Sequence, residues 1–544
     1  MTYSIQKIEY LIDQQKFNLI INILNHEQEK NDLSYYFLAK CYLLQENYLL
    51  AYENIQKAVN ISPYGFYKND IFSVLLNELS TCGKIETNRQ KIIIDSYDKF
   101  STHARAIYPF ADCITLSELE KLNYLKADYF IIPNWLSPSH PIYEKIEELN
   151  IPVISMIVDR IIHAEEHIKP NLIYADLIVC MENYAVELYK KQGFENVIYI
   201  PCAGSVGYDP YIYPPIKTEK KYDLVFLGNI KSNYTNYIYN NRKKILDKLE
   251  ELQNKYNILI KSTPSYNEYV TLTSEARICL DSTIDSKALN YRVFQAMGMG
   301  VLCFSEDDND MVKELYTDKK DLVLYNTDNL EILINYYLNN QEESNKIAKN
   351  GQIKTTQNYT HYHFIKQVID EANKMDLKKS QKKNLSQNTI SMYKGIMYYY
   401  KKDYIKAISY FEKIINNNNN EKNNNIFVQK LCLYEENKSQ ELEFEINNIF
   451  KNNENNVLIA FNYYIFLFFI KKEPDKNLIA NIKSKLESKQ FDYTGLIFLP
   501  KNQPDFELFY KLNHGEIIFE HGINSEIFIN NFYLLLLKII ETFR

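Results

Sequence analysis

Apolar residues follow different patterns in different parts of the chain, and each pattern predicts a different kind of structure. Residues 1–86 carry apolar side chains at helical spacing, which predicts helical hairpins. From residue 91 onwards, short apolar runs alternate with helix-length amphipathic segments, a pattern typical of parallel strands joined by helices. Beyond residue 374 the chain becomes rich in lysine and asparagine and then returns to a helical pattern.

The apolar runs of the central region fall into two series, which predict two separate parallel sheets. A linker rich in Gly, Pro, Tyr and Lys, ending at Lys221, separates the series. The expected strands are 92–95, 129–133, 153–158, 177–180 and 197–201 in the first sheet, and 223–228, 258–261, 278–280, 301–304 and 322–325 in the second. Helices are expected at 328–339, 343–357 and 362–374. Two domains of this kind place a cleft between the carboxyl ends of their sheets.

These patterns divide the 544 residues, too many for one core, into four predicted domains. The predicted boundaries are 1–86 for helical repeats, 87–205 for a first α/β domain, 222–374 for a second α/β domain and 375–544 for a further helical domain. The predicted fold class is therefore α/β, with two Rossmann-like domains that face a cleft and all-α hairpins at both termini.

The helical hairpin pattern is clearest between Asp32 and Pro63, where the proline ends the second helix. The small residues that would let two antiparallel helices approach closely are Ala39, Ala51 and Ala58. Their offsets match the tetratricopeptide repeat, which has a period of about 34 residues. Flanking helices are expected at Ile8–Leu24 and Ile71–Leu79.

The C-terminal region shows a weaker form of the same spacing. The matching positions are Gly395, Tyr398, Ala407 and Phe411. The asparagine runs 416–420 and 423–425 predict a low-complexity, mobile loop. Helices from Phe427 onwards are expected to pack as further hairpins.

Composition narrows the class of protein. The net charge of −7 gives no basic footprint, so no nucleic-acid partner is predicted. The first residues lack the basic and apolar regions of a signal peptide. The strongest apolar run, 457–470, is shorter than the roughly 20 residues of a membrane helix, so it is expected to be a buried helix. The 8 cysteines are dispersed without a CxxC pair, which favours a reduced, cytoplasmic protein without structural zinc.

The segment from Asn290 to Phe304 carries the strongest chemical signal. It predicts a short helix, a turn at Gly298 and Gly300, and a strand. The helix N-terminus suits a phosphate, and Arg292 adds a planar fork of donors matched to a diphosphate. The alternative is an ordinary helix–strand turn of any α/β protein.

Other candidates for donor binding follow the strands of the second sheet. Gly228, Asn229 and Lys231 come after its first strand, where phosphate-facing loops occur. Lys261 and Ser262 end the next strand and could point into the cleft. Exposed lysines in solvated turns are the alternative at both places.

Candidate acid–base residues follow the strands of the first sheet. Asp159 and His163 come after one strand, where either side chain could deprotonate an acceptor hydroxyl. A surface pair of Asp159 with Arg160 is the alternative. Asp95 and His103, after the first strand, are similar candidates.

Residues 163–167 also match the H-x-x-E-H pattern of inverted zinc proteases. Two histidines four residues apart lie on one helical face, but the sequence identifies no third ligand. We therefore predict no metal site.

Taken in order, several stretches resemble the C-terminal half of CgeB-like glycosyltransferases, a group-1-type family with the two-Rossmann GT-B fold. The matching stretches are 222–228 (YDLVFLG), 290–298 (NYRVFQAMG), 321–326 (DLVLYN), 336–338 (YYL), 347–351 (IAKNG) and 359–361 (YTH). Residues 91–205 fit the N-terminal half by pattern only. The resemblance implies a hexosyltransferase-type enzyme whose donor is a nucleotide-sugar, with no metal or other cofactor if Arg292, Lys231 and a helix dipole neutralise the leaving diphosphate.

The chain departs from this family at two positions. Relatives usually carry Glu where Gln295 stands, and retaining group-1 enzymes carry a second Glu where Lys287 stands. The resemblance places Gln295 near the ribose hydroxyls, which it can bind through its carbonyl oxygen without charge assistance. Lys287 could instead face the diphosphate. The donor, the stereochemical outcome and the activity stay open at this point.

The leading hypothesis is a cytoplasmic glycosyltransferase that moves a sugar from a nucleotide-sugar to a hydroxyl acceptor. Helical repeats form concave surfaces that hold extended peptides, so a protein acceptor is a further expectation. One alternative is a non-catalytic repeat scaffold with a degenerate transferase core. Another is a different two-Rossmann enzyme, such as a sugar-phosphate epimerase. The helices expected at 343–374 argue against the epimerase, because they resemble the segment that crosses back onto the first domain in group-1 transferases.

Overall fold

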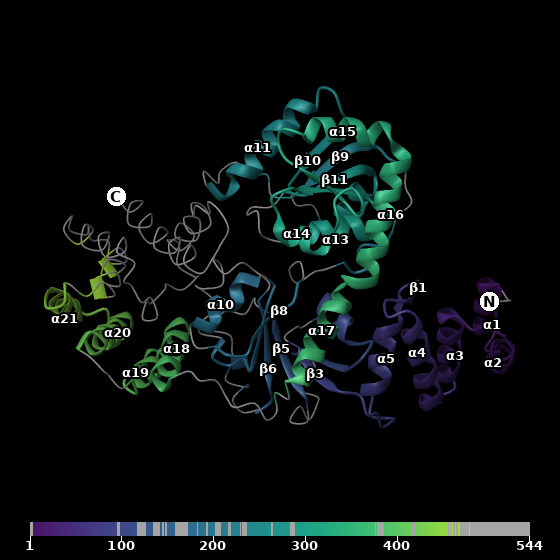
Figure 1. Ribbon diagram of the computed structural model, residues 1–544. Helices are drawn as coiled ribbons and strands as arrows, with labels where there is room; N and C mark the ends of the chain where they lie inside the picture. Colours follow the sequence, from purple (N-terminus) through teal and green to yellow (C-terminus); the bar gives the residue numbers. More distant parts are fainter. Residues whose placement is uncertain are drawn as a thin grey trace.

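The computed structural model (Figure 1) contains helical units at both ends and two α/β units between them. It describes residues 4–470 and Leu478, except for 95–97, 99, 117–126, 134–141, 144–145, 147–149, 158–171, 182, 192–193, 202–207, 216–218, 229, 231–236, 263–264, 283–288, 376, 378–385, 415–418, 455, 457–458, 461–462, 464–465 and 468–469.

The N-terminal unit consists of helices and one short hairpin. Its elements are α1 (Ile5–Asp13), α2 (Phe17–Asn25), α3 (Asp32–Leu44), α4 (Tyr48–Ile61), β1 (Phe66–Tyr67), β2 (Asp70–Ile71) and α5 (Phe72–Thr81). The single helix expected at 8–24 is wrong: the chain turns between α1 and α2 at Gln15, whose φ is 55°. Ala39, Ala51 and Ala58 are fully buried in the core of this unit, as expected for small residues between closely packed helices. The sequence pattern did not predict the β1–β2 hairpin.

Among the described residues, six parallel strands form the first sheet, in the order β4-β3-β5-β6-β7-β8. The strands are β3 (Lys91–Ile94), β4 (Asp112–Thr115), β5 (Tyr129–Pro133), β6 (Val153–Ile157), β7 (Leu177–Cys180) and β8 (Val197–Tyr199), and the helices α6 (Thr102–Ile107) and α10 (Asn183–Lys191) belong to the same unit. The apolar runs predict all of these strands except β4.

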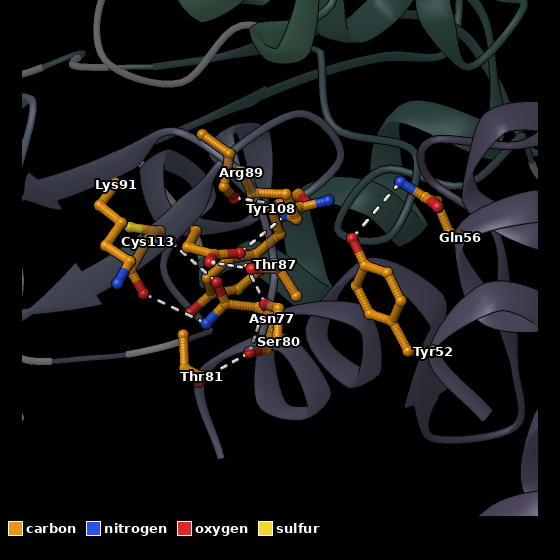
Figure 2. Close-up of polar contacts among 12 residues, drawn as sticks. Tyr52, Gln56, Asn77, Ser80, Thr81, Thr87, Arg89, Lys91, Tyr108 and Cys113 are labelled. Atoms are coloured by element: carbon orange, nitrogen blue, oxygen red, sulfur yellow. Dashed lines mark hydrogen bonds and ion pairs between the residues drawn. The ribbon is translucent and has the colours of Figure 1, made fainter. Parts of the chain in front are cut away.

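The apolar pattern did not predict strand β4, because its buried residues include the polar Asp112 and Thr115. The Asp112 carboxylate accepts hydrogen bonds from Arg89 Nε at 2.7 Å and from Ser80 Oγ at 2.6 Å. The Asn77 side chain of α5 bonds to both backbone groups of Cys113, which Figure 2 shows together with Ser80 and Arg89. These contacts fasten the N-terminal unit to the edge strand of the sheet.

Among the described residues, five parallel strands form the second sheet, in the order β10-β9-β11-β12-β13. The strands are β9 (Tyr222–Leu227), β10 (Ile258–Lys261), β11 (Ala276–Leu280), β12 (Leu302–Glu306) and β13 (Val323–Tyr325). The helices are α11 (Tyr237–Leu252), α12 (Tyr266–Ser274), α13 (Tyr291–Gly298), α14 (Asp310–Leu315), α15 (Leu330–Asn339) and α16 (Gln341–Asn358). The prediction of two separate parallel sheets is confirmed.

Helix α17 (His361–Lys374) follows α16 but packs on the first sheet, beside β3 (Figure 1). Its apolar residues Phe364, Ile365 and Val368 share a core with Ile92 and Ile94 of β3. The chain therefore returns from the second α/β unit to the first.

The opposite face of the first sheet is covered by C-terminal helices. These are α18 (Gln387–Tyr400), α19 (Tyr404–Phe411), α20 (Asn419–Asn437) and α21 (Gln440–Lys451), and Met397 shares a core with Ile132 of β5. The loop expected through the asparagine runs is wrong for residues 419–420 and 423–425, which lie in α20, while residues 416–418 lie outside the described residues. The Asn425 side chain donates a hydrogen bond to the Phe411 carbonyl at 2.6 Å, so this asparagine is buried in a helix–helix contact. In the described part of the chain, no helix is long and apolar enough to span a membrane.

Candidate functional site

Polar groups gather at the carboxyl ends of β9 and β11. These strands are parallel neighbours, so their ends lie at the same edge of the second sheet. Gly228 follows β9 directly, and Asp281 follows β11. Helix α13 starts near the same edge and carries Arg292 in its first turn. The structure therefore brings together Gly228 and Arg292, which lie more than 60 residues apart in the sequence.

Arg292 is buried and bonded to both strand ends. Its Nε donates to the Leu227 carbonyl at 2.9 Å, and its Nη1 donates to the Asp281 carboxylate at 2.7 Å. A longer contact of 3.3 Å joins Nη1 to the Ser282 carbonyl. The guanidinium also lies over the Phe226 ring, 4.9 Å from its centroid. Arg292 is thus held rigidly across the sheet edge.

The ion pair keeps the arginine charged in a buried position. Burial alone would lower the pKa of the Arg292 guanidinium, but the Asp281 carboxylate raises that pKa overall. Asp281 is fully buried and Arg292 is 8% exposed, so water screens this pair little.

One guanidinium nitrogen remains available. Nη2 of Arg292 has no hydrogen-bond partner among the described residues, and it lies beside Gly228. A methyl group on Gly228 would sit 2.5 Å from Nη2, closer than two such atoms can approach. The glycine therefore leaves room for this nitrogen.

Other polar groups fix the segment after β11. The Asn290 side chain donates to the Asp281 carboxylate at 3.0 Å instead of capping α13. Arg242 Nη2 donates to the Ser282 carbonyl at 2.6 Å, and the Tyr325 hydroxyl donates to the Asp281 carbonyl at 2.9 Å. Asn290, the first residue of the segment predicted to bind a phosphate, thus lies at the same edge as Arg292.

Gln295, one turn after Arg292, is 1% exposed. Among the described residues, neither its amide nitrogen nor its amide oxygen has a hydrogen-bond partner. The same holds for Oδ2 of Asp281 and for the hydroxyl of Ser305, which are also fully buried. A buried polar group without a hydrogen-bond partner is rare in proteins and costs free energy.

Lys261 and Ser262 lie at the end of β10. The Lys261 ammonium forms an ion pair with Glu268 in the first turn of α12, and Ser262 is exposed. Lys261 therefore has a carboxylate partner already, and its role in donor binding stays a prediction.

Several predicted site residues lie outside the described residues. They are Asn229, Lys231 and Lys287 of the predicted donor site, and Asp95, Asp159 and His163 of the predicted acid–base site. His103 is described, and its ring contacts His361 of α17. Within the described residues, no group of three or more His, Cys, Asp and Glu side chains is placed to hold a metal ion.

Sequence reasoning missed Asp281. The sequence did indicate its position, because Asp281 directly follows the apolar run 278–280 and therefore stands at the carboxyl end of a predicted strand. The pairing with Arg292 could not be read from the sequence, because it depends on how α13 returns to the strand end.

Solved structures resemble about half of this chain at low sequence identity. HepE of Anabaena, in complex with UDP and glucose, is 11% identical with a TM-score of 0.36, and the match covers 53% of this chain and 100% of HepE. Sucrose-phosphate synthase of Thermosynechococcus elongatus is 11% identical with a TM-score of 0.34, covering 48% of this chain and 77% of the synthase. A glycosyltransferase of Rickettsia africae is 11% identical with a TM-score of 0.36, and the match covers 54% of this chain and 100% of that glycosyltransferase.

Comparison with curated proteins gives no match. A family model described as "Glycosyl transferase-like" matches residues 215–370. The matched segment spans the second sheet, its helices and most of α17. Residues 215–370, which hold Arg292 and the surrounding polar edge, are therefore a glycosyl transferase-like domain.

Proposed function

We propose that this protein is a GT-B glycosyltransferase that moves a sugar from a nucleotide-sugar to a hydroxyl acceptor. The observation that carries the proposal is the position of Arg292 in the glycosyl transferase-like segment. Its charged guanidinium stands at the carboxyl edge of a parallel sheet with one nitrogen available beside Gly228. Ligands of open α/β sheets bind at this edge.

The chemistry at this edge suits a leaving nucleoside diphosphate. Negative charge develops on the diphosphate as the sugar–phosphate bond breaks, and Arg292 together with the N-terminus of α13 would stabilise that charge. Asn229, Lys231, Lys261, Ser262 and Lys287 are proposed to complete the donor site, and Asp159 with His163 to deprotonate the acceptor. No metal ion or other cofactor is required by this scheme.

The matching stretches between residues 222 and 361 motivate the proposal of a CgeB-like enzyme. The helical units at both ends motivate the proposals of tetratricopeptide-like repeats and a protein acceptor. The N-terminal unit is a stack of short helices with its own apolar core, and such stacks offer extended concave surfaces. We place the enzyme in the cytoplasm, because its cysteines are dispersed and the described ones are free.

The test is to incubate the full chain with a panel of nucleotide-sugars and to measure release of the free nucleoside diphosphate. The proposal expects release from at least one donor, and release should fall strongly in Arg292→Ala. A matched control is Lys243→Ala, which removes an exposed cation of α11 that pairs with Asp247. Absence of both nucleotide binding and turnover with every donor would overturn the proposal.

A second candidate is a binding protein whose transferase core no longer turns over. It is favoured by the internal pairing of Arg292 with Asp281 and of Lys261 with Glu268, and by the burial of Gln295. This candidate expects measurable nucleotide binding without release of nucleotide from any donor, so the same panel separates the two functions.

A further inference from the structure

We propose that Asp281 is a positioning residue for donor binding: it fixes Arg292 so that the single nitrogen Nη2 faces the donor's diphosphate beside Gly228. This inference rests on the proposed function. It assigns a role to a residue that the sequence did not single out, and it gives a physical reason for the glycine after β9.

The three nitrogens of the Arg292 guanidinium have different environments. Nε is bonded to the Leu227 carbonyl at 2.9 Å, and Nη1 is bonded to Asp281 Oδ1 at 2.7 Å. Because the guanidinium is planar, these two bonds from separate strand ends fix its plane and its rotation. Nη2 then has a single direction, towards Gly228, with both of its N–H groups unbonded among the described residues.

Asp281 is itself anchored, so it can act as a fixed point. Its backbone N–H donates to the Phe304 carbonyl at 2.7 Å, and its backbone carbonyl accepts from the Tyr325 hydroxyl at 2.9 Å. Its Oδ1 also accepts from Asn290, the residue before α13. The carboxylate therefore ties the start of α13 to the sheet edge as well as holding Arg292.

Removing the carboxylate would leave Arg292 buried without its charge partner. Its long side chain would be expected to turn towards water, because an unpaired buried charge is strongly unfavourable. Nη2 would then leave its place beside Gly228. Asp281 thus acts on the diphosphate through Arg292 and not by direct contact.

Gly228 contributes space. Any side chain there would place its Cβ 2.5 Å from Nη2 and would push the guanidinium away from the ligand. The structure thus assigns to Gly228 a close approach between backbone and arginine, and the backbone needs no left-handed conformation there.

The experiment is a double-mutant cycle by calorimetric titration. The proteins are the full chain, Asp281→Ala, Arg292→Ala and the double variant. The probes are the nucleoside diphosphate with the best-bound base and the corresponding nucleoside. Asp281→Ala should weaken the diphosphate on the order of tenfold to a hundredfold, the range for one charged hydrogen bond. When Arg292 is already alanine, Asp281→Ala should weaken the diphosphate much less than it does in the native background. Nucleoside affinity should stay unchanged in every variant.

Two further variants strengthen the test. Asp281→Asn keeps an oxygen acceptor for Nη1 but not the charge that pairs with the guanidinium, so it should weaken diphosphate binding by less than Asp281→Ala does. Gly228→Ala should weaken the diphosphate in the native background and have no effect in the Arg292→Ala background. Gly228→Ala also tests the position of Nη2 if the Asp281→Ala protein fails to fold.

Each outcome decides the matter. Additive losses in the cycle, or equal weakening of nucleoside and nucleoside diphosphate, would overturn the inference while leaving the proposed function standing. If the native protein binds no nucleoside diphosphate of any base, both the proposed function and the inference that rests on it are wrong.

Discussion

Nδ1 of His103 lies 2.7 Å from Nε2 of His361, although the two residues are 258 positions apart in the sequence. His103 belongs to α6 of the first α/β unit, and His361 is the first residue of α17. Beside them, Arg105 forms a buried ion pair with Asp209 at 2.7 Å. The contact therefore marks the point where the returning chain is fastened to the first unit.

We predict that this contact weakens in mild acid. Burial lowers the pKa of His103 to about 4 and lowers the pKa of His361 well below its usual value, an effect that the nearby His103 and Arg105 increase. In the unfolded chain both histidines titrate near pH 6.5, so unfolding takes up protons between about pH 6.5 and 4. Stability is fully present above pH 6.5 and is lost as the pH falls through this window. Thermal melts at a series of pH values measure this loss of stability.

The control for this prediction is His103→Gln, which can keep a hydrogen bond to His361 but cannot titrate. Its melting temperature should fall less steeply between pH 6.5 and 4 than that of the native protein. Equal slopes for the two proteins would assign the acid sensitivity to groups other than this pair.

The second prediction concerns Gly298 at the end of α13. A methyl group at this position would lie 2.2 Å from the ring of Tyr208, which is fully buried and forms a backbone bridge with Thr360. Gly298→Ala should destabilise the protein by about 1–3 kcal/mol through overpacking, although alanine is the better helix former. Denaturant unfolding measures this loss. The loss should largely disappear in a Tyr208→Leu background, and a loss of the same size there would show that the ring is not the cause.

The strands were well predicted because parallel strands that are buried on both faces appear as continuous apolar runs. In β6 all positions are buried, and in β7 all are buried as well. Strand β4 is different, since the partner of its buried Asp112 is Arg89, which lies before the preceding strand. The helix through the asparagine run was missed for a similar reason: Asn425 is stabilised by the Phe411 carbonyl of another helix. Partners distant in sequence leave no local pattern.

The site was predictable only in part. The helix–turn–strand pattern located α13 and Arg292 at the sheet edge. It gave no indication that Asp281 already binds this arginine or that Gln295 is buried. Both facts depend on the angle at which α13 meets the strand ends, which spacing along the chain does not encode.

The third prediction concerns Gln295. The amide is buried and has no hydrogen-bond partner in the part of the chain that the structure describes. Gln295→Glu should therefore place an uncompensated charge in the core and destabilise the fold by about 2 kcal/mol or more. Gln295→Leu removes the unpaired amide at similar size, so it should be neutral or stabilising. Thermal melts with and without nucleoside diphosphate measure both variants. A Gln295→Glu protein that melts normally and binds the nucleotide more tightly would instead place this residue at the ribose.

The last prediction concerns the contact between the N-terminal helical unit and the edge of the first sheet. The Asn77 side chain accepts a hydrogen bond from the Cys113 N–H at 2.8 Å and donates one to the Cys113 carbonyl at 3.1 Å, so it pairs with the edge strand as a neighbouring strand would (Figure 2). Asn77→Leu keeps the volume but removes both bonds in a buried place. It should lower the free energy of unfolding by about 2–4 kcal/mol.

The matched control is Thr81→Ala, one turn further along α5. The Thr81 hydroxyl donates only to the Asn77 carbonyl of its own helix, at 2.7 Å, so its loss should cost less than about 1 kcal/mol. Chemical denaturation compares the two variants, and hydrogen exchange at the Cys113 amide reports on the contact directly. Faster exchange in Asn77→Leu than in Thr81→Ala is expected, because the amide would lose its side-chain acceptor. Equal exchange in both variants would mean that the Asn77 side chain does not protect the Cys113 amide, and that the Ser80–Asp112 hydrogen bond and apolar packing join the helical unit to the sheet.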